Sequence, residues 1–310
     1  MAKHKSILRS PFRYSGGKSK SSIIQRIKKY FPEKIDEYRE CCVGGGGVFF
    51  SIPQNAVKRR WINDLDENLI SVYLALRDRP EAFIASCKAI EAAKDGEPLT
   101  SARQNGREIH NARLKAKFDE LANDPNADPA LRYFFINRTV WLGRVNYNEP
   151  SQLYFSSDKG WDIVDTNRLE RVAEHMKDTK ITCLDYRKVL EEPGQDGEEV
   201  IIYVDPPYVV NTSLSKSRRL YAHNFEMQDH YDFAEEVKKC RHKVLVSYDD
   251  DKKGIVRSLF KEEDGFHIFE AEWAYCGTNS SDTAKNQKVK KLGKELIITN
   301  YEAGKEGQVF

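Results

Sequence analysis

The chain has 310 residues, of which 40% are hydrophobic, 11% are aromatic and 32% carry a charge. This composition is typical of a packed globular protein with a solvated surface, and it excludes a chain that is disordered over long spans. Because the formal net charge is only +2, a nucleic-acid partner has to be recognised from local clusters of Lys and Arg rather than from the overall balance.

Helix and strand patterns alternate along the first 76 residues. Ile23, Ile24 and Ile27 have the spacing of one helical face, and Pro32 follows the end of that pattern. Two strand-like runs come next, and the first of them leads into the glycines at 44–47. In chain order we predict a helix over 18–30, a strand over 38–43, a strand over 58–62 and a helix over 65–76.

The composition changes over residues 77–165, which are polar and rich in Ala, Asn and Lys. An aromatic cluster stands within this segment, at Tyr133, Phe134, Phe135 and Trp141. We interpret 77–165 as a mostly helical insertion with a small core of its own.

Helix and strand patterns alternate again after the insertion. Val200–Val204 is continuously apolar and rich in β-branched residues, as is typical of a strand buried on both faces of a parallel sheet. The other predicted elements are a helix over 168–176 and strands over 181–184, 243–247, 267–270 and 295–299. We therefore predict an α/β fold with a Rossmann-like sheet built from 1–76 and 166–310, interrupted by the insertion.

Two glycine-rich stretches fail the nucleotide motifs that they superficially match. Phe12 stands where a P-loop ending in Gly17-Lys18-Ser19 needs a glycine, and Gly44–Gly47 lack the third glycine of a dinucleotide fingerprint. What remains is a glycine turn after one strand, with Asp64 at the end of the next. In doubly wound folds that pairing binds a nucleoside, and the carboxylate accepts hydrogen bonds from the ribose. A plain tight turn and a strand-end cap would give the same pattern.

Asp205-Pro206-Pro207-Tyr208 follows the strand over 200–204, at the end of the strand where open α/β sheets hold their active sites. Two consecutive prolines make the backbone rigid and leave the Pro206 carbonyl free to accept a hydrogen bond. A fixed carboxylate, a carbonyl and an aromatic face suit a planar amide-like or amino-aromatic group.

Four ordered blocks now resemble the Dam-type adenine-specific DNA methyltransferases, the class whose cofactor motifs precede the target-recognition insertion. The blocks are Phe12–Lys18, the glycine-rich Val43–Phe49, Asn63-Asp64 and the tetrapeptide Asp205–Tyr208. Weaker matches are Cys183–Tyr186, Glu295–Tyr301 and the pair Arg144 and Asn146. The chain departs from the family at Cys41-Cys42, where Pro-Phe is common, and in the residues after Asn146, so the resemblance implies no recognition sequence.

The resemblance implies S-adenosylmethionine as the cofactor and N6 of a flipped-out adenine in double-stranded DNA as the target. Asp205 and the Pro206 carbonyl would accept hydrogen bonds from N6, and Tyr208 would stack on the base. It also implies Tyr14 against the methionine part of the cofactor, Lys18 near its carboxylate and Asp64 on the ribose. The full expected cofactor set is Tyr14, Gly16, Gly17, Lys18, Val43, Gly44, Gly45, Gly46, Gly47, Asp64, Asp185 and Tyr186.

DNA contacts are expected from three places. Arg13 precedes the cofactor segment, and Arg144 and Asn146 have side chains able to make bidentate contacts to base edges. A polar segment supplies the remaining candidates for gripping phosphates, Lys216, Arg218, Arg219 and Tyr221. A second basic run, Lys285, Lys288, Lys290, Lys291 and Lys294, is by itself typical of a solvated face.

Three other functions stay open at this point. An RNA adenine N6 methyltransferase would use the same tetrapeptide, a glutamine N5 methyltransferase of proteins would generally begin it with Asn, and a regulatory DNA-binding protein could have lost catalysis. A cognate restriction endonuclease is a candidate partner, and we expect a monomer. The six cysteines lack zinc-ligand spacing, and no run suits a signal peptide or a membrane span. We therefore expect no metal and a cytoplasmic location.

Overall fold

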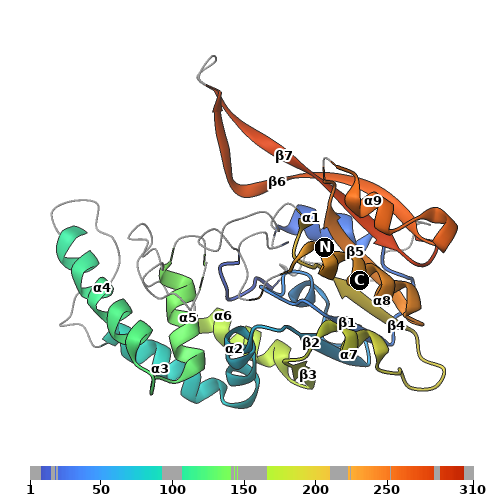
Figure 1. Ribbon diagram of the computed structural model, residues 1–310. Coiled ribbons are helices and arrows are strands. Elements are labelled where there is room, and N and C mark those ends of the chain that lie inside the picture. The colour runs from blue at the N-terminus through green and yellow to red at the C-terminus, as the bar shows by residue number, and fades with distance from the viewer. Residues whose placement is uncertain are drawn as a thin grey trace, which may run out of the picture.

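A seven-stranded sheet forms the centre of the protein, with helices on both faces (Figure 1). The computed structural model describes residues 8–14, 18, 20–92, 107–140, 143, 145, 166–209, 223, 225–251, 253–282 and 287–303. The strand order is β3-β2-β1-β4-β5-β7-β6. The strands are β1 (Glu37–Glu40), β2 (Arg59–Asn63), β3 (Thr179–Thr182), β4 (Val200–Val204), β5 (Lys243–Asp249), β6 (His267–Asp282) and β7 (Gln287–Thr299).

The strand pairing confirms the predicted α/β, Rossmann-like architecture. β1 pairs in parallel with β2 on one side and with β4 on the other, and β3 and β5 extend the parallel sheet outward. β7 is antiparallel to both β5 and β6. The order along the chain reverses between β1 and β4, and ligands of open α/β sheets bind outside the carboxyl ends of the strands at such a switch point.

Side chains of β4 reach the cores on both faces of the sheet, as predicted. Ile201 and Tyr203 belong to one hydrophobic cluster, and Ile202 and Val204 belong to the other. Buried residues of α1 (Ser21–Lys28), α2 (Glu67–Asp78) and α6 (Thr166–Met176) pack in the first cluster. Those of α7 (Tyr186–Glu191), α8 (Met227–Lys239) and α9 (Ile255–Leu259) pack in the second.

The described part of the insertion is helical, but it has no separate core. Its helices are α3 (Pro80–Ala92), α4 (Arg107–Asn123) and α5 (Pro129–Thr139), gathered at one end of the molecule (Figure 1). Phe134 of α5 packs edge-on against Phe12, which packs in the same way against Tyr73 of α2. The prediction of an independent core was therefore wrong, because the aromatic side chains of α5 complete the core on one face of the sheet.

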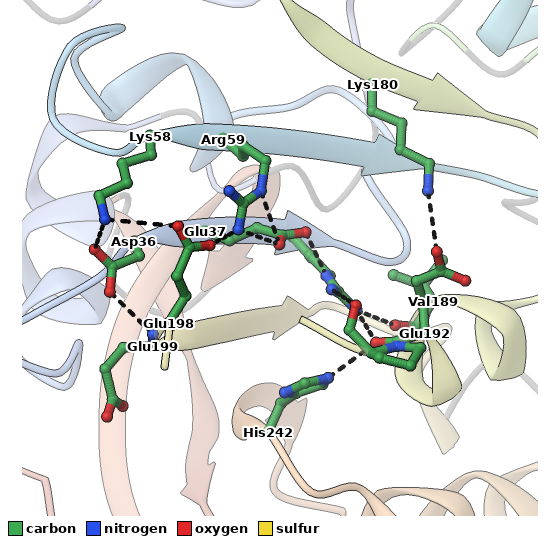
Figure 2. Close-up of polar contacts among 12 residues, drawn as sticks. Asp36, Glu37, Lys58, Arg59, Lys180, Val189, Glu192, Glu198, Glu199 and His242 are labelled. Atoms are coloured by element: carbon green, nitrogen blue, oxygen red, sulfur yellow. Dashed lines mark hydrogen bonds and ion pairs between the residues drawn. The ribbon is translucent and has the colours of Figure 1, made fainter. Parts of the chain in front are cut away.

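A polar network joins the amino-terminal ends of the central strands (Figure 2). The Lys58 ammonium nitrogen lies 3.1 Å from a carboxylate oxygen of Asp36 and 3.5 Å from one of Glu198. The Arg59 guanidinium lies 3.2 Å from a carboxylate oxygen of Glu37. The backbone N–H of Glu199 donates to Asp36 at 3.0 Å, and this bond is the main reason that the pKa of Asp36 falls to about 2. These contacts join the starts of β1, β2 and β4, at the opposite edge from the predicted site.

Candidate active site

The predicted site residues gather at one edge of the sheet. The glycine turn follows β1, Asp64 follows β2, Asp185 follows β3, and Asp205 follows β4. Because these four strands are parallel, their carboxyl ends lie along the same edge.

Tyr14 lies against the glycine turn. A β-carbon added to Gly44 or Gly45 would lie 2.8 Å from the nearest atom of the Tyr14 side chain, so the ring approaches the turn as closely as it does only because these residues are glycines. Gly44 also has a φ of +46°, in the left-handed region. The hydroxyl of Tyr73 donates to the Gly44 carbonyl at 2.8 Å, and this hydrogen bond fixes the turn against α2.

Asp64 also holds the glycine turn, through hydrogen bonds to the backbone. One carboxylate oxygen accepts from the Gly44 N–H at 2.8 Å, and the other accepts from the Asp66 N–H at 3.1 Å. Burial is the main cause that raises the pKa of Asp64 to about 6. The carboxylate therefore shapes the glycine turn directly.

Asp185 and Tyr186 open α7. Asp185 accepts from the Arg187 N–H at 2.9 Å and so caps the helix. The Tyr186 ring packs edge-on against Phe233 at 5.4 Å. Its hydroxyl oxygen is buried without a hydrogen-bond partner among the residues described. A buried donor left in this way suits a polar atom of a bound ligand.

Asp205 lies in a polar cluster that also contains Lys18, Tyr208, Ser247 and Glu295, which we call the Lys18 cluster. The Lys18 ammonium lies 2.5 Å from Asp205 Oδ1 and also donates to the Tyr208 hydroxyl. The Ser247 hydroxyl donates to the same Asp205 oxygen at 3.1 Å. Lys18 is 4% exposed, so this charge is held in a protein environment rather than in water.

Glu295 was not among the predicted site residues. It lies in β7, is fully buried, and accepts the Tyr208 O–H at 2.8 and 3.0 Å through its two oxygens. The Oε2 atom of Glu295 lies 3.9 Å from the ammonium nitrogen of Lys18. Burial outweighs the nearby Lys18 charge and raises the pKa of Glu295 to about 8. The available signal was an acidic residue at the start of the apolar run Leu296-Ile297-Ile298.

Glu40 was also missed. It is the last residue of β1, four positions before Gly44 of the glycine turn, and it is 2% exposed. The Tyr38 hydroxyl donates to it at 2.5 Å, but burial dominates and raises its pKa to about 8. A carboxyl group at the end of a strand and before a glycine turn was a signal that the sequence offered.

The segment before the site is held by α5 of the insertion. Asn137 accepts from the Arg13 N–H at 3.0 Å and donates to the Arg13 carbonyl at 2.7 Å and to the Gly143 carbonyl at 3.1 Å. A β-carbon on Gly143 would lie 1.9 Å from the Arg13 carbonyl oxygen. Asn137 is fully buried, and no sequence motif pointed to it.

Five further predicted site residues lie next to those already described. Val43, Gly46 and Gly47 lie in the turn after β1, and Pro206 and Pro207 lie between Asp205 and Tyr208. Lys18 contacts Asp205 in the structure, and nothing in the structure tests the contact with a cofactor carboxylate that the resemblance implies. The contact of Arg13 with DNA stays a prediction. Outside the described residues lie Gly16, Gly17, Arg144, Asn146, Lys216, Arg218, Arg219 and Tyr221.

The described residues contain neither a metal-binding group of side chains nor a membrane-spanning helix. No group of three or more His, Cys, Asp or Glu side chains among them is placed to hold a metal ion. No helix in that part of the chain is long and apolar enough to cross a membrane.

Comparison with known proteins agrees with this geometry. The model of the D12 class N6 adenine-specific DNA methyltransferases matches residues 14–276. The type II methyltransferase M1.LlaDCHI of Lactococcus lactis subsp. cremoris is 27% identical over 309 residues, which cover 97% of this chain and 98% of that protein. A DNA adenine methylase of Vibrio cholerae is 25% identical over 248 residues, covering 78% of this chain and 82% of its own. The type II methyltransferase M.MjaIII of Methanocaldococcus jannaschii is 25% identical over 239 residues, covering 74% and 79%.

Proposed function

The chain belongs to the D12 class N6 adenine-specific DNA methyltransferases, and from this premise we propose which residues bind the cofactor, bind DNA and promote the reaction. The protein is an enzyme that methylates adenine in DNA at N6. The observation that carries our assignment is the Lys18 cluster, which lies at the carboxyl end of β4, next to the glycine turn after β1.

The cofactor that fits this site is S-adenosylmethionine. Its positively charged sulfur makes the attached methyl group electrophilic. Tyr14, Gly16, Gly17 and the turn over 43–47 would line its site, with Asp64 toward the ribose and Asp185 and Tyr186 around the adenine. The close approach of Tyr14 to Gly44 and Gly45, and the buried Tyr186 hydroxyl, suit this assignment.

Asp205 and Pro206 are the residues that we assign to the target amine. The N6 lone pair of adenine is delocalised into the ring, so the amine is a poor nucleophile. The Asp205 carboxylate and the Pro206 carbonyl would each accept one N6 hydrogen, which localises the lone pair for attack. Transfer would form the N6–carbon bond and break the bond between that carbon and the sulfur, so that S-adenosylhomocysteine leaves with the bonding electron pair. One N6 proton would then be released to solvent. Most of the rate enhancement would then come from positioning in a preorganised polar site.

Lys18 and Tyr208 position these acceptors. The Lys18 ammonium holds the Asp205 carboxylate and the Tyr208 hydroxyl together, and Glu295 accepts from that hydroxyl. With its hydroxyl held in this way, the Tyr208 ring has a fixed plane on which a flipped adenine would stack. We therefore assign Lys18 to the orientation of Asp205 rather than to the cofactor.

The DNA duplex has to release its adenine into this site, because N6 cannot be reached inside the helix. Flipping a base costs a few kcal/mol. We propose that residues 77–165 form the target-recognition insertion, with Arg144 and Asn146 reading base edges. Arg13 and the segment carrying Lys216, Arg218, Arg219 and Tyr221 would hold the backbone or fill the gap.

The biological setting is also a proposal. We expect the enzyme to act as a monomer, with double-stranded DNA as its substrate and the cytoplasm as its location. Two relatives are type II methyltransferases, and on that basis we propose a cognate restriction endonuclease as its partner.

Transfer of labelled methyl groups to matched duplex DNA, single-stranded DNA and RNA tests the proposal. We expect N6-methyladenine in the duplex, within one repeated sequence context. Equal or greater transfer to RNA, with little to duplex DNA, would contradict the proposal that duplex DNA is the substrate.

A further inference from the structure

β6 and β7 extend beyond the sheet as a two-stranded ribbon. β7 pairs with β5 only from Glu295 to Thr299, and the last pair joins Glu295 to Asp249, the final residue of β5. Farther out, β7 pairs with β6 alone, from Lys294 with Glu272 to Gln287 with Asp282. Eight strand residues, 287–294, span about 26 Å at ~3.3 Å per residue. Figure 1 shows this ribbon standing clear of the other strands.

The ribbon leaves the sheet at the edge that carries the site. β7 runs antiparallel to β5, so its residues before Glu295 lie past the carboxyl end of β5. Glu295, at the base of the ribbon, accepts the Tyr208 O–H of the Lys18 cluster. Arg26 of α1 donates to the backbone carbonyl of Glu272 in β6, and this bond holds the β6 strand where the ribbon meets the sheet. A duplex whose adenine enters the site would therefore have its flank beside the ribbon.

The charge of the ribbon favours a polyanion as its partner. Its β7 strand carries Lys288, Lys290, Lys291 and Lys294, whereas its β6 strand carries only Glu272 and Asp282 as acidic residues. A two-stranded hairpin without a third strand is only marginally stable in water, so a long one is best explained by a partner that it contacts. The dimensions of a two-stranded ribbon match the major groove of DNA.

We propose that the β6–β7 ribbon, residues 272–282 and 287–294, is a DNA-binding arm that contacts phosphates of the duplex flanking the target adenine. This inference rests on the proposed function and adds a contact surface to it that is separate from the insertion. The match to the family model ends at residue 276, within β6, so the outer part of the ribbon lies beyond it. Phosphate contacts carry no sequence information, so the arm would add affinity without changing the methylated sequence.

The test replaces Lys288, Lys290 and Lys291 together by Ala in the full-length chain. Each lost phosphate contact lowers the slope of log Kd against log salt by about 0.9, so three contacts should lower it by roughly 2 to 3. We expect KM for duplex DNA to rise about tenfold or more at low salt. The value of kcat at saturating DNA should change by less than about twofold, since no reacting group is removed.

A matched control replaces three exposed lysines elsewhere, Lys177, Lys239 and Lys261, each paired with a nearby glutamate. This variant loses the same formal charge and should keep the wild-type salt slope. A second ribbon variant combines Lys288→Arg, Lys290→Arg and Lys291→Arg, which keeps the charge and should give the wild-type slope and KM. It also separates loss of charge from loss of the fold.

An Ala variant with the wild-type KM and salt slope would overturn the proposal. So would an equal change in the control variant, because net charge alone would then explain the effect. Failure of the proposed function is distinct from both results, since the wild-type protein itself would then transfer no methyl group to DNA.

Discussion

The ammonium nitrogen of Lys18 lies 2.5 Å from a carboxylate oxygen of Asp205, across 187 residues of chain. The contact brings the segment before α1 into the site that follows β4. Lys18 also donates to the Tyr208 hydroxyl, so one buried cation orients both side chains on which the proposed chemistry depends.

Replacement of Lys18 by Met should lower kcat by about a hundredfold, because removal of one preorganised polar group costs about that much. Binding of S-adenosylmethionine, measured by calorimetry, should stay within about threefold of wild type. Lys29→Met, at an exposed residue after α1, serves as the control. A large loss of cofactor affinity with an unchanged kcat would instead place Lys18 at the cofactor carboxylate, as the resemblance implied.

Replacement of Asp64 by Ala should weaken cofactor binding by roughly 10- to 100-fold, as expected for lost hydrogen bonds to a charged group. It releases the Gly44 N–H, which Asp64 holds at 2.8 Å. Asp66→Ala is the matched control, since it removes the cap of α2 and should cost about 1 kcal/mol of stability with little effect on binding. Unchanged affinity of Asp64→Ala in calorimetry would remove Asp64 from the site.

Glu40 should make the protein less stable as the pH rises. Burial raises its pKa in the folded state to about 8, from a usual value of 4.5. Between pH 4.5 and about 8 the folded state holds a proton on Glu40 that the unfolded state has released. The contribution of this proton to the free energy of unfolding is complete below the unfolded-state pKa and is lost as the pH rises through the folded-state pKa. Glu40→Gln does not titrate there.

Thermal unfolding of wild type and Glu40→Gln between pH 5 and 9 measures this effect. The melting temperature of Glu40→Gln, relative to that of the wild type, should increase as the pH rises. Glu295 has a similarly raised pKa but is present in both proteins, so its contribution cancels. A difference between the two proteins that stays constant with pH would contradict the assignment.

Gly143 tests how closely the insertion holds the segment before the site. Both Gly143 and Gly254 have a positive φ, of +68° and +67°, but only Gly143 has an atom within 4 Å of an added β-carbon. Gly254→Ala should cost about 1 to 2 kcal/mol for the left-handed backbone. Gly143→Ala should cost about 1 to 3 kcal/mol more, because the Arg13 backbone has to move. Equal losses in denaturant unfolding would show that the contact with Arg13 contributes nothing.

Much of the fold could be predicted because strong local patterns encode it. The apolar run Val200–Val204 became β4 with the predicted bounds, and the glycine turn and Asp205 lie at the strand ends where they were expected. β1 ended three residues early, at Glu40, since the chain turns there into the glycines. α8 was not predicted, although His230, Phe233, Ala234 and Val237 have the spacing of one buried helical face.

The contacts within the site could not be predicted, because they join residues that are distant in sequence. Nothing near Lys18 indicates Asp205 or Glu295 as its neighbours. Asn137 likewise binds the Arg13 backbone across 124 residues. The outer parts of β6 and β7 were missed for another reason, since their pairing depends on a long antiparallel register rather than on apolar alternation.

The most direct test of the central claim compares wild type and Asp205→Ala for methyl transfer to unmethylated plasmid DNA, followed by nucleoside analysis. We predict N6-methyladenine with the wild-type protein and none with the variant, while cofactor binding by the two proteins remains similar. Methylation by Asp205→Ala at the wild-type rate would contradict the account, as would a wild-type product other than N6-methyladenine.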